Sequence, residues 1–104
     1  MADKKLVIST AGSKEEASRI ARTLVEERLA ACVNIIGPIE SVYRWQGKLE
    51  NAAEFLMLVK TVSAKSKTVI KRLQELHSYE LPEAIEIDMD GGNPEYLEWI
   101  AASV

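Results

Sequence analysis

The sequence predicts an α+β fold with one long β-hairpin at its centre. Two observations carry this prediction. Hydrophobic spacing along the 104 residues changes between the strand period and the helix period in the order β-α-β-β-α-β, followed by one more helix. The stretch from Cys32 to Lys60 contains two long apolar arms joined at Gln46-Gly47, which is typical of a two-residue hairpin loop. This order is the split βαβ pattern of ferredoxin-like folds, and the length fits one domain, residues 1–104.

The N-terminal quarter predicts a strand followed by an amphipathic helix. Residues 5–10 form a short apolar run that is expected to be a buried strand. Ser13 and Glu16 have the spacing of a capping box, so a helix is expected to begin there and to end near Ala30. Apolar residues recur along it at helical spacing, at Ala17, Ile20, Ala21, Leu24, Val25 and Leu29.

The central hairpin has arms that are expected at residues 33–45 and 48–60, with Trp45 opposite Lys48. An unbroken arm of this length spans roughly 40 Å, so the tip must overhang the domain or the ribbon must bend at Gly37-Pro38. Residues 55–59 are apolar on both faces of the second arm. Since exposed strands of this kind aggregate, other copies of the chain are expected to cover them.

The C-terminal half predicts a helix, a strand and a last short helix. The helix opens within 63–67 and ends near His77, and residues 84–88 alternate as a strand with one covered face. Asn93 is expected to cap the last helix, with Pro94 at its first position. In a ferredoxin-like fold the first two helices lie on one face of the sheet. The other face is therefore the expected contact in a homo-oligomer of closed symmetry.

Composition excludes several classes of partner. The formal net charge is −3 and the basic residues are scattered among acids, which is against a nucleic-acid footprint. One cysteine cannot form an internal disulfide. Neither an apolar run of about 18 residues nor a secretion leader is recognised, so we expect no membrane span and a cytoplasmic location.

Three segments of the sequence are distinctive: residues 29–34 (LAACVN), 41–48 (SVYRWQGK) and 77–83 (HSYELPE). Together they resemble the CutA family, the divalent-cation tolerance proteins. Their order and spacing also match, and the resemblance covers essentially the whole chain. It implies a ferredoxin-like subunit, a homotrimer whose architecture is similar to that of PII signalling proteins, and a role in copper binding and metal tolerance.

The resemblance also implies a weakened copper site. Family members with copper sites use a cysteine in the first strand and paired histidines at the end of the second helix, and these positions are Ser9, Leu76 and His77 here. We therefore expect copper or another divalent metal to bind weakly, through His77 with Glu80, and Cys32 is a further candidate ligand.

Two of these metal candidates also have structural interpretations. His77 stands at a helix C-terminus, where a histidine can bond the last carbonyls and complement the helix dipole. Cys32 lies in an apolar run that enters a strand, and a free cysteine there is often a small buried hydrophobic residue.

A second group suggests a pocket for a small ligand. Two aromatic faces, a cation and an anion are supplied by five residues that an overhanging hairpin tip would bring together at a subunit junction, namely Tyr43, Trp45, Lys60, Tyr79 and Glu80. Alternatively, Tyr43 and Trp45 anchor the tip on a neighbouring subunit. Glu50, Glu54 and Glu83 are expected to be solvated or rim charges.

These observations favour a non-enzymatic protein. Cys32 and His77 stand in different contexts with no paired base or nucleophile, and 90–92 (DGG) is too short and acidic to cradle phosphate. The expected function is divalent-metal (copper) binding and tolerance by a homotrimer. The alternative is a trimeric signalling module that binds a small molecule or a protein.

Overall fold

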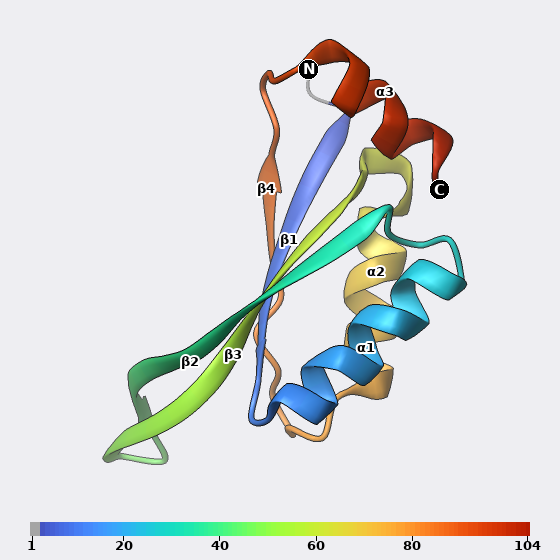
Figure 1. Cartoon of the computed structure of the whole chain (residues 1–104). Coiled ribbons are helices and arrows are strands. Elements are labelled where there is room, and N and C mark those ends of the chain that lie inside the picture. The colour runs from blue at the N-terminus through green and yellow to red at the C-terminus, as the bar shows by residue number, and fades with distance from the viewer. Residues whose placement is uncertain (1–2) are drawn as a thin grey trace.

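The computed structural model describes residues 3–104 and has the predicted order of elements (Figure 1). The elements are β1 (Lys4–Ala11), α1 (Lys14–Glu26), β2 (Cys32–Trp45), β3 (Lys48–Val62), α2 (Ser63–Leu76), β4 (Ile85–Asp88) and α3 (Pro94–Ala102). The four strands form an antiparallel sheet in the order β2-β3-β1-β4. The predicted ferredoxin-like α+β fold is confirmed, with β1 and β3 at the centre of the sheet.

Helix α1 begins as predicted and ends earlier than predicted. The Ser13 hydroxyl accepts a 3.1 Å hydrogen bond from the backbone N–H of Glu16, as its capping position requires. The helix ends at Glu26 and not near Ala30, because Arg28 takes a left-handed conformation with φ of 58°. The N–H of the next residue then bonds back to the Leu24 carbonyl at 2.9 Å, and this pairing closes a Schellman motif.

The core lies between the sheet and helices α1 and α2, which cover the same face. Cross-strand pairs Val7–Val59 and Ser9–Met57 point into this layer and are fully buried. The helices contribute fully buried residues at helical spacing, which are Ala17, Ile20, Leu24, Val69 and Leu73. Burying a side chain of this kind contributes about 1.5–3 kcal/mol, so this layer supplies most of the stabilisation within one chain.

The opposite face of the sheet is apolar and open. The strand register places a second set of hydrophobic residues there, made of Leu6, Ile8, Ile36, Leu56, Leu58, Ile85 and Ile87. Ile36, Ile85 and Ile87 are 47 %, 50 % and 42 % exposed. The prediction that β4 has one covered face is therefore wrong for the isolated chain. The two isoleucines of β4 point away from the helices, and Glu86 lies on the helix side within 3.3 Å of the Lys5 ammonium group.

The hairpin forms as predicted. Trp45 pairs with Lys48, and the loop residues Gln46 and Gly47 have φ of 51° and 81°, as a type I′ turn requires. The β2–β3 register is interrupted between Ile36 and Ile39, so the ribbon bends at the predicted place. A side chain at position 37 would overlap the ring of Phe55, and only glycine fits there.

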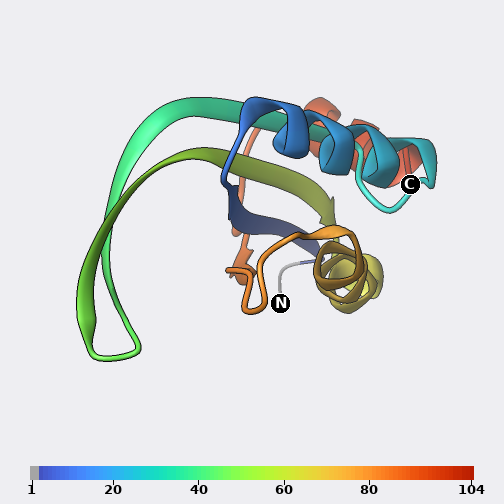
Figure 2. The same ribbon diagram turned by 90° about the horizontal axis from the view of Figure 1, so that it is seen from below.

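The hairpin also overhangs the rest of the chain. The described residues extend over 44 × 25 × 22 Å, and the long dimension follows the hairpin. Figure 2 shows both arms curving away from the sheet beyond the end of β1. This curvature brings the tip of the hairpin round toward the loop that joins α2 to β4.

Candidate functional site

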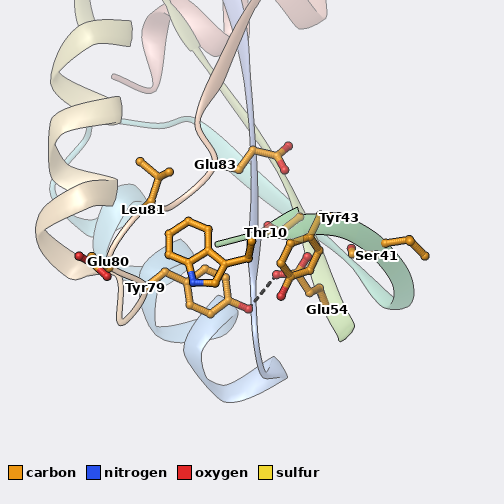
Figure 3. A pocket seen from close by; sticks show the side chains of 10 residues that line it. Thr10, Ser41, Tyr43, Glu54, Tyr79, Glu80, Leu81 and Glu83 are labelled. Atoms are coloured by element: carbon orange, nitrogen blue, oxygen red, sulfur yellow. Dashed lines mark hydrogen bonds between the residues drawn. The ribbon is translucent and has the colours of Figure 1, made fainter. Parts of the chain in front are cut away.

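A hollow of about 670 Å³ lies between the curved hairpin, the end of β1 and the loop that joins α2 to β4 (Figure 3). This volume is within the range of small-molecule sites. Its lining comes from segments far apart in the sequence and consists of Thr10, Ser41, Val42, Tyr43, Trp45, Glu54, Tyr79, Glu80, Leu81 and Glu83. The bend of the hairpin is what brings residues 41–45 to face residues 79–83.

A hydrogen bond between Tyr79 and Glu54 closes the floor of the hollow. The Tyr79 hydroxyl donates to one carboxylate oxygen of Glu54 at 2.7 Å (Figure 3). Glu54 is only 7 % exposed. The tyrosine lies close to Gly12, where a Cβ atom would stand 3.1 Å from the hydroxyl. Burial and the carboxylate of Glu54 both raise the pKa of Tyr79, so the phenol keeps its proton and acts as a donor.

The hollow combines negative charge with aromatic surface. Three of the lining residues are glutamates, of which only Glu54 is buried, while Glu80 and Glu83 are exposed. Tyr43 and Trp45 are 44 % and 38 % exposed, so their rings remain accessible in the chain. Among the described residues the lining contains no lysine, arginine or histidine. The hollow therefore presents an acidic, partly apolar surface.

His77 lies behind this wall and is fully committed to structural contacts. Its Nδ1 atom accepts a hydrogen bond from the backbone N–H of Tyr79 at 3.1 Å, so the proton of the neutral ring sits on Nε2. Nε2 then donates to the carbonyl of Thr10 at 2.6 Å. The side chain is completely buried, and its ring lies 4.6 Å from the ring of Tyr79. His77 thus joins the end of α2 to the end of β1 and positions Tyr79.

Glu16 strengthens the same junction from helix α1. One of its carboxylate oxygens accepts a hydrogen bond from the backbone N–H of Ser78 at 2.7 Å and lies 3.6 Å from Nδ1 of His77. Burial alone raises the pKa of Glu16, but hydrogen bonding from Ser78 and the neighbouring His77 and Arg19 outweigh it and hold the pKa below its ordinary value. The loop of the hollow is therefore tied to both α1 and β1.

Cys32 and Lys60 form a separate cluster at the other end of the sheet. The Lys60 ammonium group lies 3.5 Å from the Cys32 thiol and also donates to the side chain of Asn34. The hydroxyl of Tyr96 in α3 lies 3.6 Å from the same thiol. On β3, Lys60 pairs with Cys32, and Leu56, four residues earlier, pairs with Thr10 at the edge of the hollow. Four strand residues correspond to roughly 13 Å.

The structure therefore divides the side chains that the sequence analysis singled out. Tyr43, Trp45, Tyr79 and Glu80 do meet in one hollow, whereas Lys60 is not part of its lining. The three predicted metal ligands, His77, Glu80 and Cys32, are not brought together. Within residues 3–104, no group of three or more histidine, cysteine, aspartate or glutamate side chains is arranged to hold a metal ion.

Glu54 is a residue of the hollow that sequence reasoning missed. It was expected to be a solvated or rim charge, and this expectation is wrong because the Tyr79 loop covers it. One signal was available in the sequence. Glu54 is the single carboxylate between Ala52 and Lys60, in the most apolar part of the hairpin, where a charge without a role is costly.

The arrangement is suited to binding. Two accessible aromatic rings, a buried carboxylate and a protonated phenol face one volume. Neither cysteine nor histidine is among the described lining residues, so the hollow does not present a nucleophile paired with an imidazole base.

Comparisons with known proteins agree on one family. The family model described as CutA1 divalent ion tolerance protein matches residues 5–103. The divalent-cation tolerance protein CutA of Thermus thermophilus is 45 % identical over 92 % of this chain and 93 % of its own length. The crystal structure of CutA from Xylella fastidiosa superimposes with a TM-score of 0.96 at 45 % identity, covering 98 % of each chain.

Relatives in eukaryotes can be longer and can carry a named location. The rice protein CutA 1, chloroplastic, is 41 % identical over 94 % of this chain, which spans 55 % of the rice protein. In residues 3–104 no helix is both long enough and apolar enough to cross a membrane. The prediction of a cytoplasmic location is not confirmed by these findings.

Proposed function

Because this chain belongs to the CutA1 divalent ion tolerance protein family, we propose that it acts in divalent-cation tolerance as a non-enzymatic, cytoplasmic homotrimer that binds its ligand in the hairpin hollow. The hollow carries the proposal. It has the volume of a small-molecule site, and its floor is built from a buried carboxylate and a tyrosine that other contacts hold in place.

The proposed trimer accounts for the open face of the sheet. A contiguous apolar surface of seven aliphatic residues is more than a monomer normally exposes, and closed symmetry would cover it with other copies. The overhanging hairpin also needs a neighbour, because Leu49 near its tip is 73 % exposed and lies outside the hollow. Both features support association through the sheet.

Weak binding of copper or another divalent metal is a second candidate function. One observation favours it: the Nδ1 atom of His77 and a carboxylate oxygen of Glu16 lie 3.6 Å apart, which places two suitable ligand types side by side. A metal there would have to displace the Tyr79 amide from Nδ1, and no third ligand of the described residues is near. Any such affinity should therefore be modest.

Native mass spectrometry of the purified protein tests these candidates together. We expect a small molecule retained in the assembly, and its loss from the double variant Tyr43→Ala, Trp45→Ala, in which two walls of the hollow are removed. Calorimetric titration with copper should show only weak binding. A tight copper site that disappears in His77→Ala, with no retained small molecule, would instead favour metal coordination as the function.

A further inference from the structure

The most unusual feature of the hollow is that its buried carboxylate has no cationic partner in the part of the chain that the structure describes. Glu54 is 93 % shielded from solvent, yet within residues 3–104 it forms no ion pair and accepts one hydrogen bond, from the neutral hydroxyl of Tyr79. Buried charges in proteins are normally paired, because desolvation of an unpaired carboxylate is costly. A carboxylate has room for several more donors.

The surroundings of Glu54 show where its missing partner would lie. Glu54 and Tyr43 both line the hollow, and Figure 3 shows the Glu54 carboxylate bonded there to the Tyr79 hydroxyl. Tyr43 and Trp45 offer accessible aromatic surface in the same volume, and aromatic faces attract cations. The remaining charges of the lining, Glu80 and Glu83, are also negative.

We propose that the hollow binds a small organic cation, an ammonium or guanidinium group on an apolar body, with the charge on Glu54 and the body against Tyr43 and Trp45. This inference rests on the proposed function, since it names the ligand class of the same site. A phosphate-bearing or carboxylate ligand does not fit, because the lining that residues 3–104 provide supplies three negative charges and no positive one. A bare divalent metal fits less well, because the described carboxylates do not converge into a set of ligands.

The tyrosine supports this specificity. Because its pKa is raised, Tyr79 stays a hydrogen-bond donor and occupies one oxygen of Glu54, while the other oxygen has no partner among the described residues and is not fully buried. The carboxylate is thereby held in one orientation. Tyr79 is itself held in place by His77, which bonds both the Tyr79 amide and the Thr10 carbonyl at the end of β1. The site is therefore organised before a ligand binds.

Three probes of one shape test the proposal: benzylamine as the cation, benzyl alcohol as its neutral analogue and benzoate as the anion. Binding can be followed in the assembled, isotope-labelled protein by the indole N–H signals of its two tryptophans. Trp45 lines the hollow, and Trp99 in α3 lies outside it and serves as an internal control. We expect benzylamine to shift the Trp45 signal alone and to bind about tenfold or more tightly than benzyl alcohol, with no binding of benzoate.

Two variants locate the effect. Glu54→Gln keeps an acceptor for the Tyr79 hydroxyl and should abolish the preference for benzylamine over benzyl alcohol. Glu40→Gln removes a carboxylate on the same hairpin outside the lining and should leave binding unchanged. Circular dichroism of both variants checks that they fold.

The possible failures are distinguishable. Equal or tighter binding of benzyl alcohol or benzoate at Trp45 would overturn the cation inference and leave the hollow as a binding site. An unchanged preference in folded Glu54→Gln would also overturn the inference. No shift with any of the three probes would overturn both the inference and the proposed use of the hollow, and this is also the result expected if a neighbouring subunit fills it.

Discussion

Replacing His77 by alanine separates a structural histidine from a metal ligand. The structure assigns the ring to the junction of α2, β1 and the Tyr79 loop. Removing it leaves the buried carbonyl of Thr10 without its donor, which costs about 1–3 kcal/mol. The amide of Tyr79 loses its acceptor, which costs about 0.5–1 kcal/mol more. The aromatic contact with Tyr79 adds about 0.5–1 kcal/mol.

The total is about 3 kcal/mol per chain, and it can be measured by urea denaturation followed by circular dichroism. With a slope of about 2 kcal/mol per molar urea, the midpoint of His77→Ala should fall by about 1.5 M. Protein concentration must be held fixed, because the proposed association would contribute to stability. The matched control is Lys71→Ala, an exposed site on the same helix, which should stay within about 0.5 kcal/mol of wild type.

His77→Gln sharpens the assay, since its amide can donate to the Thr10 carbonyl and accept from Tyr79. We expect it to recover part of the loss. The structural assignment is refuted if His77→Ala keeps the wild-type midpoint and loses copper affinity, as a ligand that contributes little to folding would.

Three other predictions follow from the same contacts. Glu16 has a depressed pKa, so its stabilisation is present above its ordinary pKa and is lost as pH falls. The unfolding midpoint of Glu16→Gln should therefore depend less on pH than that of the wild type between about pH 5 and 3. Parallel plots of midpoint against pH for the two proteins would contradict this. Gly37→Ala should cost about 1–3 kcal/mol by displacing Phe55, and adding Phe55→Leu should restore part of that loss in urea denaturation, whereas additive losses would disprove the clash. Light scattering of Trp45→Ala should give the same mass as the wild-type assembly, whereas calorimetry should no longer detect binding of benzylamine. A fall to the mass of one chain would identify Trp45 as an assembly anchor instead.

Much of the fold could be predicted from the sequence because its signals are local. The turn at Gln46-Gly47, the caps at Ser13 and Asn93, and the bend at Gly37 each depend on a few neighbouring residues. The end of α1 was less predictable. A left-handed Arg28 closes that helix, and arginine has no intrinsic preference for this conformation that a sequence would show.

The candidate site could be predicted only in part. The grouping of Tyr43 and Trp45 with Tyr79 and Glu80 was predicted at a subunit junction, with anchoring of the tip on a neighbouring subunit as the alternative, and the structure brings the four residues together within one chain. The placement of Lys60 and Glu54 was not predicted. Both lie on the same strand, and which end of a long strand a loop covers depends on the curvature of the hairpin, which local sequence does not determine.

The mass of the protein in solution tests the central claim most directly, since binding in the hollow and burial of the open sheet face are both proposed for an assembly of this chain. Light scattering at low micromolar concentration should give about three times the chain mass of 11.6 kDa. Leu58→Glu, which places a charge at the centre of the open face, should reduce that mass. A folded wild-type protein with the mass of one chain, with Ile36, Ile85 and Ile87 exposed to water, would contradict the account.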